Sequence, residues 1–208
     1  MMINVTQFAP PLVAILRGLA PADAQAAGAA LFGAGMRLLE VPLNRPGALE
    51  SIAILARMAP KDAIVGGGTM LSVADVEAVH AAGGRLLVAP NCNSAVIARG
   101  AALGMLCAPG VATPTEAFAA LAAGAHALKI FPAEMVGTAG LKALITVLPP
   151  GTPVWPVGGV APDTMAAWVA AGATGFGIGS QLYFPGIDAG QLSARAAHFL
   201  AAWRAANQ

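Results

Sequence analysis

The residues of this sequence that suggest chemistry begin with a lysine inside a short apolar run. Lys129 lies in the middle of residues 127–132 (Ala-Leu-Lys-Ile-Phe-Pro), a stretch about as long as one β-strand. Burial penalises an ammonium group, so a buried lysine needs either a lowered pKa or a close partner. A lysine that is neutral near physiological pH is a nucleophile that condenses with carbonyl groups to form a Schiff base. The alternative is a lysine at a strand end whose ammonium reaches water.

Lys129 belongs to a unit that recurs along the chain: a short apolar strand, a turn, an alanine-rich helix and a glycine before the next strand. The expected strands cover residues 12–17, 37–43, 63–69, 85–89, 105–109, 126–131, 153–157 and 174–179. The expected helices cover residues 21–34, 46–58, 72–82, 94–103, 113–123, 137–148, 161–171 and 189–206. The glycines expected to end helices in the left-handed conformation are Gly35, Gly83, Gly104, Gly124 and Gly172. Counted over six repeats, their spacing averages about 23 residues, close to one βα unit.

Eight alternating βα units predict a parallel sheet closed into a (β/α)8, or TIM, barrel, with residues 1–208 forming a single domain. An open doubly wound sheet is the alternative. The Gly-x-Gly-x-x-Gly fingerprint does not follow the first expected strand, which disfavours that alternative. In a barrel, chemistry is expected at the C-terminal ends of the strands, on side chains that point inward.

Period-two alternation turns one polar side chain from each of four strands into the barrel. These residues are Arg17, Glu40, Thr69 and Lys129. For the third strand, this interpretation places Val65 and Gly67 on the inward face together with Thr69. The four polar side chains are therefore expected to meet at one mouth of the barrel.

The four side chains together suit a 2-keto acid. Arg17 and the Thr69 hydroxyl would hold the carboxylate, since a guanidinium grips it bidentately. Lys129 would condense with the keto carbon, and Glu40 would move protons. For Lys129 and Glu40 alone, a structural ion pair is the alternative.

Glycine-rich loops after the seventh and eighth strands form a second group. Gly158 and Gly159 close strand seven, and Gly179 and Ser180 follow strand eight. In these barrels, loops at those two positions bind phosphate through backbone N–H groups. Tight turns alone would also explain the glycines. Residue Glu134, in the loop after the lysine strand, lies where it could approach the site.

Composition restricts the partners and the location. The net charge is +1 and charged residues make up 10% of the chain without a basic cluster, so nucleic acid is not expected as a partner. Hydrophobic residues make up 57%, but Gly, Pro or a charge interrupts nearly every apolar stretch before the length of a membrane-spanning helix. The first ten residues lack a signal-peptide pattern, and Cys92 and Cys107 are typical of reduced thiols, so we expect a cytoplasmic protein. His80, His126 and His198 lack metal-ligand spacing, and we expect no metal and no cofactor.

The chain resembles the bacterial KDPG/KHG aldolase family nearly from end to end. The motifs that carry the resemblance are residues 14–18 (AILRG), 39–44 (LEVPLN), 65–69 (VGGGT), 127–132 (ALKIFP) and 157–160 (VGGV). The resemblance implies a (β/α)8 fold, class I pyruvate aldolase activity and a homotrimer. It implies that Lys129 is the Schiff-base lysine and that Glu40 is the acid/base group, acting through a bound water. It also places the pyruvate carboxylate near Arg17 and Thr69.

The resemblance places the substrate phosphate near Gly158, Gly159, Gly179 and Ser180. Phe131 and Val157 are also expected to contact the substrate. Within the family, gluconate-type enzymes carry Arg-Thr after the glutamate motif and Thr before the strand-seven Gly-Gly. This chain has Asn44-Arg45 and Val157 there, which resembles the branch acting on the C4 epimer, 2-dehydro-3-deoxy-6-phosphogalactonate. A lost hydrogen bond to the C4 hydroxyl is a physical reason for such a preference.

The expected reaction is therefore reversible cleavage of 2-dehydro-3-deoxy-6-phospho-D-galactonate to pyruvate and D-glyceraldehyde 3-phosphate, in galactonate catabolism. Within the family, the alternatives are the C4-epimeric gluconate substrate and 4-hydroxy-2-oxoglutarate. A phosphosugar isomerase or epimerase, with Glu40 as base, is the alternative from another enzyme class. A non-catalytic phosphosugar-binding barrel is the third.

Overall fold

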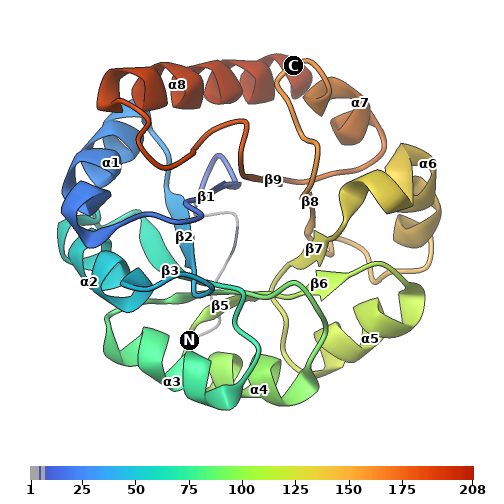
Figure 1. Cartoon of the computed structure of the whole chain (residues 1–208). Coiled ribbons are helices and arrows are strands. Elements are labelled where there is room, and N and C mark those ends of the chain that lie inside the picture. Colours follow the sequence, from blue (N-terminus) through green and yellow to red (C-terminus); the bar gives the residue numbers. More distant parts are fainter. Residues whose placement is uncertain (1–4, 6–7) are drawn as a thin grey trace.

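A computed structural model describes residue 5 and residues 8–208, and it confirms the alternation of strands and helices. The elements, in chain order, are β1 (Leu12–Ile15), α1 (Pro21–Ala34), β2 (Leu38–Pro42), α2 (Ala48–Met58), β3 (Ile64–Gly68), α3 (Val73–Ala81), β4 (Leu86–Val88), α4 (Ser94–Ala102), β5 (Leu106–Ala108), β6 (Gly110–Val111), α5 (Pro114–Ala122), β7 (Leu128–Ile130), α6 (Ala133–Ile145), β8 (Val154–Pro156), α7 (Met165–Ala170), β9 (Phe176–Ile178) and α8 (Ala189–Ala206). The helices surround the strands, and the last helix, α8, packs beside the first helix, α1 (Figure 1).

The strands pair in parallel, but they form two sheets. The larger sheet has the order β5-β4-β3-β2-β1-β9, and the smaller has the order β6-β7-β8. The expected fifth strand, residues 105–109, contains β5, and β6 is an additional short strand beyond its expected end. Pro109, which has no N–H to donate to a ladder, separates the two. A single parallel bridge between Val157 and Gly177 links the end of β8 to β9. The expected alternation and parallel pairing are confirmed, whereas the eight uninterrupted strands of the sequence prediction are nine short segments.

Two hydrophobic clusters lie on the two faces of the strands. The inner cluster consists of Val5, Phe8, Val13, Leu38, Leu86, Val88, Leu106, Ala108, Ala127 and Trp155. The outer cluster joins the other strand face to the helices and includes Leu39, Val41, Leu128 and Ile130. Adjacent strand residues thus belong to different clusters, as period-two alternation requires. This division fixes which side chains can meet inside the ring of strands.

Local signals explain most helix boundaries. Ser72 and Thr113 start α3 and α5 with capping boxes, because each hydroxyl accepts from the N–H three residues on. The five glycines expected to end helices all have positive φ, between 68° and 108°. Two helices differ from expectation. The helix predicted from residue 137 starts at Ala133 and is broken at Gly137 (φ 66°, ψ 170°), and α7 is shorter than predicted.

Candidate active site

Lys129 is the central residue of β7 and points to the inner side of the strands, as predicted. Its flanking residues, Leu128 and Ile130, pack in the outer cluster against the helices. Its backbone N–H donates to the carbonyl of Pro109 (2.9 Å), and it stands in register with Trp155 of β8. Only 8% of the residue is exposed, so the ammonium does not extend freely into water. The alternative of a strand-end lysine that reaches water is therefore wrong.

Glu40 of β2 faces the same interior cavity as Lys129. The cavity is lined by Val13, Ile15, Glu40, Val88, Ala108, Lys129, Trp155, Val157 and Gly177. Its volume of about 10 Å³ corresponds to one water molecule. Glu40 is 2% exposed, and its Oε2 has no hydrogen-bond partner within the described residues. A buried carboxylate oxygen without a partner is costly for stability, which indicates a functional role for this residue.

Lys129 and Glu40 are not a contact ion pair. Among the described residues, the ion pairs within 4.0 Å are Arg37–Asp62 and Arg99–Glu77, both near the surface. Burial lowers the pKa of Lys129, an effect that Arg17 reinforces and Glu40 opposes. Burial likewise raises the pKa of Glu40 against the opposing effects of Lys129 and Arg17. Both shifts favour the neutral forms, namely a nucleophilic amine and a carboxyl group able to exchange protons.

Arg17 lies two residues beyond the end of β1, at the mouth, with its side chain exposed. It is close enough to influence the pKa values of both Lys129 and Glu40. The inward orientation predicted for strand one is confirmed by Val13 and Ile15, which line the cavity. An exposed guanidinium above a buried amine is suited to a carboxylate that enters from solvent.

Thr69 requires a correction to the sequence prediction for strand three. Val65 packs in the outer cluster, and a Cβ on Gly67 would meet the side chains of Val79 and Met70. The inward residues are therefore the alternate ones, and a Cβ on Gly68 would overlap Oε2 of Glu40. Gly68 therefore makes room for the Glu40 carboxylate.

Thr69 itself follows the end of β3 and is half-buried. It has φ +56° and is the one non-glycine residue with positive φ within residue 5 and residues 8–208. Left-handed backbone is strained for a β-branched side chain, so period-two alternation does not extend to this residue. Its hydroxyl makes no hydrogen bond to any described residue, and it remains available to a ligand.

Phe131 supports the lysine directly. The Nζ of Lys129 lies 4.7 Å from the centroid of the Phe131 ring. A cation over an aromatic face is stabilised by the ring quadrupole. This contact orients the lysine side chain, and it favours the protonated amine, in opposition to the effect of burial.

The two glycine-rich loops are placed differently with respect to the cavity. Val157 lines the cavity together with Lys129, and its bridge to Gly177 brings the ends of β8 and β9 together. Gly158 and Gly159 follow with positive φ (118° and 59°). Ser180 is exposed and Gly179 is half-buried at the end of β9. Glu134, named from the sequence as a residue that could approach, lies against Gly158 and Gly159.

One residue that lines the cavity was not predicted from the sequence. Trp155 lines the cavity beside Lys129 and was missed, although counting back two residues from Val157 on strand seven would have identified it. Cys107 is fully buried, and burial raises its pKa to about 12, so it packs as a small apolar side chain rather than acting as a nucleophile.

Two further results concern the part of the chain that the structure describes. In that part, no three His, Cys, Asp or Glu side chains group together as metal ligands. There too, none of the helices combines the length and the apolar character needed to span a membrane.

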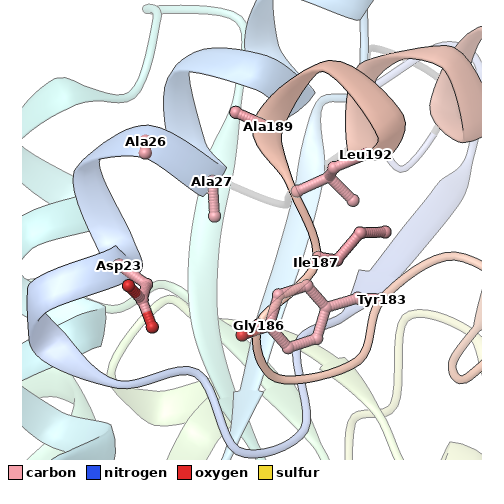
Figure 2. A pocket seen from close by; sticks show the side chains of 8 residues that line it. All are labelled: Asp23, Ala26, Ala27, Tyr183, Gly186, Ile187, Ala189 and Leu192. Atoms are coloured by element: carbon pink, nitrogen blue, oxygen red, sulfur yellow. The ribbon is translucent and has the colours of Figure 1, made fainter.

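A separate cavity lies away from Lys129. It occupies about 150 Å³ between α1, α8 and the segment that joins β9 to α8. Figure 2 shows Asp23 and Tyr183 beside it, together with small and aliphatic side chains. Burial, and then Asp23, raises the pKa of Tyr183. Its lining, as far as the described residues show it, includes neither an amine nor a second carboxylate.

Comparisons with known proteins agree with this geometry. Residues 3–194 match the family model described as KDPG and KHG aldolase. The probable 2-dehydro-3-deoxy-6-phosphogalactonate aldolase of Rhizobium meliloti (strain 1021) is 47% identical, over 94% of this chain and 92% of that protein. The 2-dehydro-3-deoxy-6-phosphogalactonate aldolase of Escherichia coli (strain K12) is 44% identical, over 95% of this chain and 97% of that protein. A solved structure described as native KDPGal superimposes with a TM-score of 0.95 at 43% identity and covers 100% of both chains.

Proposed function

The chain belongs to the KDPG and KHG aldolase family, and on that premise we propose that it is a class I aldolase acting on 2-dehydro-3-deoxy-6-phospho-D-galactonate. The products would be pyruvate and D-glyceraldehyde 3-phosphate. The observation that carries the proposal is that a buried lysine and a buried glutamate face one water-sized cavity without forming an ion pair. A structural pair would be in contact, whereas a catalytic pair needs space for the reacting atoms between its members.

In the proposed reaction, the neutral amine of Lys129 attacks the C2 keto carbon of the substrate. The neutral carboxyl group of Glu40 protonates the hydroxyl of the carbinolamine, which leaves as water and gives an iminium ion, so that Glu40 becomes a carboxylate. Glu40 accepts the proton of the C4 hydroxyl, directly or through a water, as the C3–C4 bond breaks and D-glyceraldehyde 3-phosphate leaves. The bond electrons pass into the iminium and form an enamine. Glu40 then gives the proton to C3. Water hydrolyses the pyruvate iminium and frees the lysine, and the proton released in this step returns to Glu40.

The surroundings of the two residues suit these steps. Burial lowers the pKa of Lys129 and so increases its neutral fraction. The exposed Arg17, with the hydroxyl of Thr69, would hold the substrate carboxylate at the mouth. Because the iminium ion is the electrophile, the proposal assigns neither a metal nor a cofactor.

The distal half of the substrate would lie against the ends of β8 and β9. Backbone N–H groups around Gly158, Gly159, Gly179 and Ser180 would receive the phosphate. Val157 would face the C4 hydroxyl, where its isopropyl group offers no hydrogen bond. That chemistry favours the galactonate epimer over an epimer whose recognition needs a hydroxyl at residue 157.

We also infer that the two sheets work as one closed (β/α)8 barrel and that the whole chain is one domain. The Val157–Gly177 bridge and the passage of β5 into β6 across Pro109 support closure. A homotrimer is supported by apolar side chains exposed on α5, on α6 and just beyond α6: Phe118, Met135 and Val147. Two free thiols support a cytoplasmic location.

Borohydride reduction in the presence of pyruvate tests the mechanism. We expect a covalent adduct on Lys129 that peptide mass spectrometry locates, and no adduct in Lys129→Ala. Label on Lys61 or Lys142, or no label, would contradict the proposal and favour an isomerase or a binding protein. A coupled assay of pyruvate release on the two phosphorylated C4 epimers, measured side by side, then tests the substrate.

A further inference from the structure

Glu134 is held above the end of β8 by the first turn of α6. The N–H of Ala133 donates to the carbonyl of Val157 (3.0 Å), which ties this turn to the strand that carries the glycine loop. The helix breaks at Gly137, so residues 133–136 form a short turn distinct from the rest of α6. The position of Glu134 is therefore set by the loop between β7 and α6 rather than by the body of the helix.

The Glu134 side chain lies directly against the two glycines. A Cβ on Gly158 would be 3.0 Å from Oε1 of Glu134, and it would come closer still to Oε2. A Cβ on Gly159 would be 3.1 Å from the same Oε1. Side chains at residues 158 and 159 would thus occupy the space that the carboxylate fills. The positive φ of both glycines disfavours such side chains independently.

Among the residues that the structure describes, the Glu134 carboxylate has no partner of opposite charge. Within residue 5 and residues 8–208, Glu134 takes part in no ion pair and accepts no hydrogen bond. The N–H groups of Gly159 and Ser180 are likewise without acceptors among the described residues. An anion that approaches these N–H groups therefore meets a fixed negative charge beside them.

We propose that Glu134 sets the charge selectivity at the distal end of the substrate site, weakening the binding of a phosphate dianion there. This inference rests on the proposed function, because it takes the loop after β8 to be the place where the distal end of the substrate binds. Repulsion between a carboxylate and a dianion raises the KM for phosphorylated substrates and leaves uncharged ends unaffected. Glu134 is then a specificity residue, which limits product retention by an otherwise anion-attracting loop.

Glu134→Gln tests this, because it removes the charge and retains the size of the side chain. In the synthetic direction, with saturating pyruvate, we expect the KM for D-glyceraldehyde 3-phosphate to fall about three- to tenfold at low salt. The KM for unphosphorylated D-glyceraldehyde is expected to stay unchanged, and the difference to shrink at high salt. Glu50→Gln is the matched control, since Glu50 is also an exposed carboxylate in the first turn of a helix, α2.

A second measurement does not depend on catalysis. Inorganic phosphate should raise the melting temperature of the Glu134→Gln protein more than that of the unmodified protein. An unchanged or raised KM for the phosphorylated aldehyde, or an unchanged response to phosphate, would overturn the inference. If the unmodified protein forms no pyruvate adduct under borohydride, the proposed function fails instead. Adduct formation with no effect of Glu134→Gln rejects only the present inference.

Discussion

The carboxylate of Glu40 occupies the space that a side chain at residue 68 would fill. A Cβ built on Gly68 would overlap Oε2 of Glu40. Glu40 and Gly68 come from adjacent strands, and Pro42 of β2 is in register with Gly68 of β3. The glycine of one strand therefore decides where the carboxylate of its neighbour lies, and this relationship leads to the first prediction.

Gly68→Ala is expected to displace Glu40 and lower kcat at least about a hundredfold, the usual loss when a general acid/base is misplaced. The borohydride adduct should still form, because Lys129 is not displaced. Gly67→Ala is the control: its Cβ would meet flexible side chains on the α3 side, so it should reduce stability more than kcat. Normal turnover by Gly68→Ala would show that the position of Glu40 is not critical.

The pKa of Lys129 should respond in opposite directions to its two charged neighbours. Arg17→Met removes a cation that lowers this pKa, so the pKa should rise. Glu40→Gln removes an anion that raises it, so the pKa should fall. Both pKa changes can be measured from the rate at which an uncharged, amine-reactive reagent modifies Lys129 as a function of pH. Lys61 serves as the internal reference. Shifts in the same direction would contradict the assigned electrostatics.

Substitutions at Thr69 can separate the effect of its backbone strain on stability from the effect of its hydroxyl on substrate binding. Thr69→Asn should stabilise the protein by about 1 kcal/mol, since Asn tolerates the left-handed backbone better. Thr69→Val retains the branched shape and the strain but lacks the hydroxyl, so its stability should be unchanged while its KM for the keto acid rises. Urea unfolding and steady-state kinetics on both variants provide the two readings. A Thr69→Asn protein that is no more stable would mean that the backbone relaxes.

Val157→Thr should shift the epimer preference. A hydroxyl added at the cavity wall can hydrogen-bond the C4 hydroxyl of the gluconate epimer, a gain of about 1 kcal/mol. The ratio of kcat/KM for the gluconate and galactonate substrates should therefore rise about fivefold. Val157→Ala is the control that removes bulk without adding a donor. An equal change in the ratio for both variants would assign the effect to space rather than hydrogen bonding.

Because of His126, which lies outside the candidate active site, we expect the stability of the folded protein to fall in acid. Its Nδ1 accepts from the N–H of Cys107 (3.1 Å), and burial lowers its pKa. The folded protein therefore binds the proton less readily than the unfolded chain, and stability should fall as the pH drops below about 6.5. His126→Asn keeps an acceptor but does not titrate, so its midpoint in urea should depend less on pH. Identical pH profiles would exclude His126 as the cause.

Much of the chemistry could be predicted from the sequence. Lys129 and Glu40 each stand between aliphatic neighbours, and strict alternation leaves only the inner side of the strands for them. Repeated glycine-ended helices indicated the alternating parallel units. These conclusions depend on local periodicity, which each segment carries by itself.

What the tertiary structure decided concerns relationships between segments. Pro109 separates β5 from β6 because it has no N–H to donate to a ladder, but only the assembled sheets show that the two strands pair with different neighbours. The positive φ of Thr69 breaks the alternation that assigned Val65 and Gly67 to the inner face. The space left by Gly68, the separation of Lys129 from Glu40 and the position of Glu134 on the glycine loop all arise from packing between different strands. The sequence determined which residues could react, and the packing of the strands determined how they face one another.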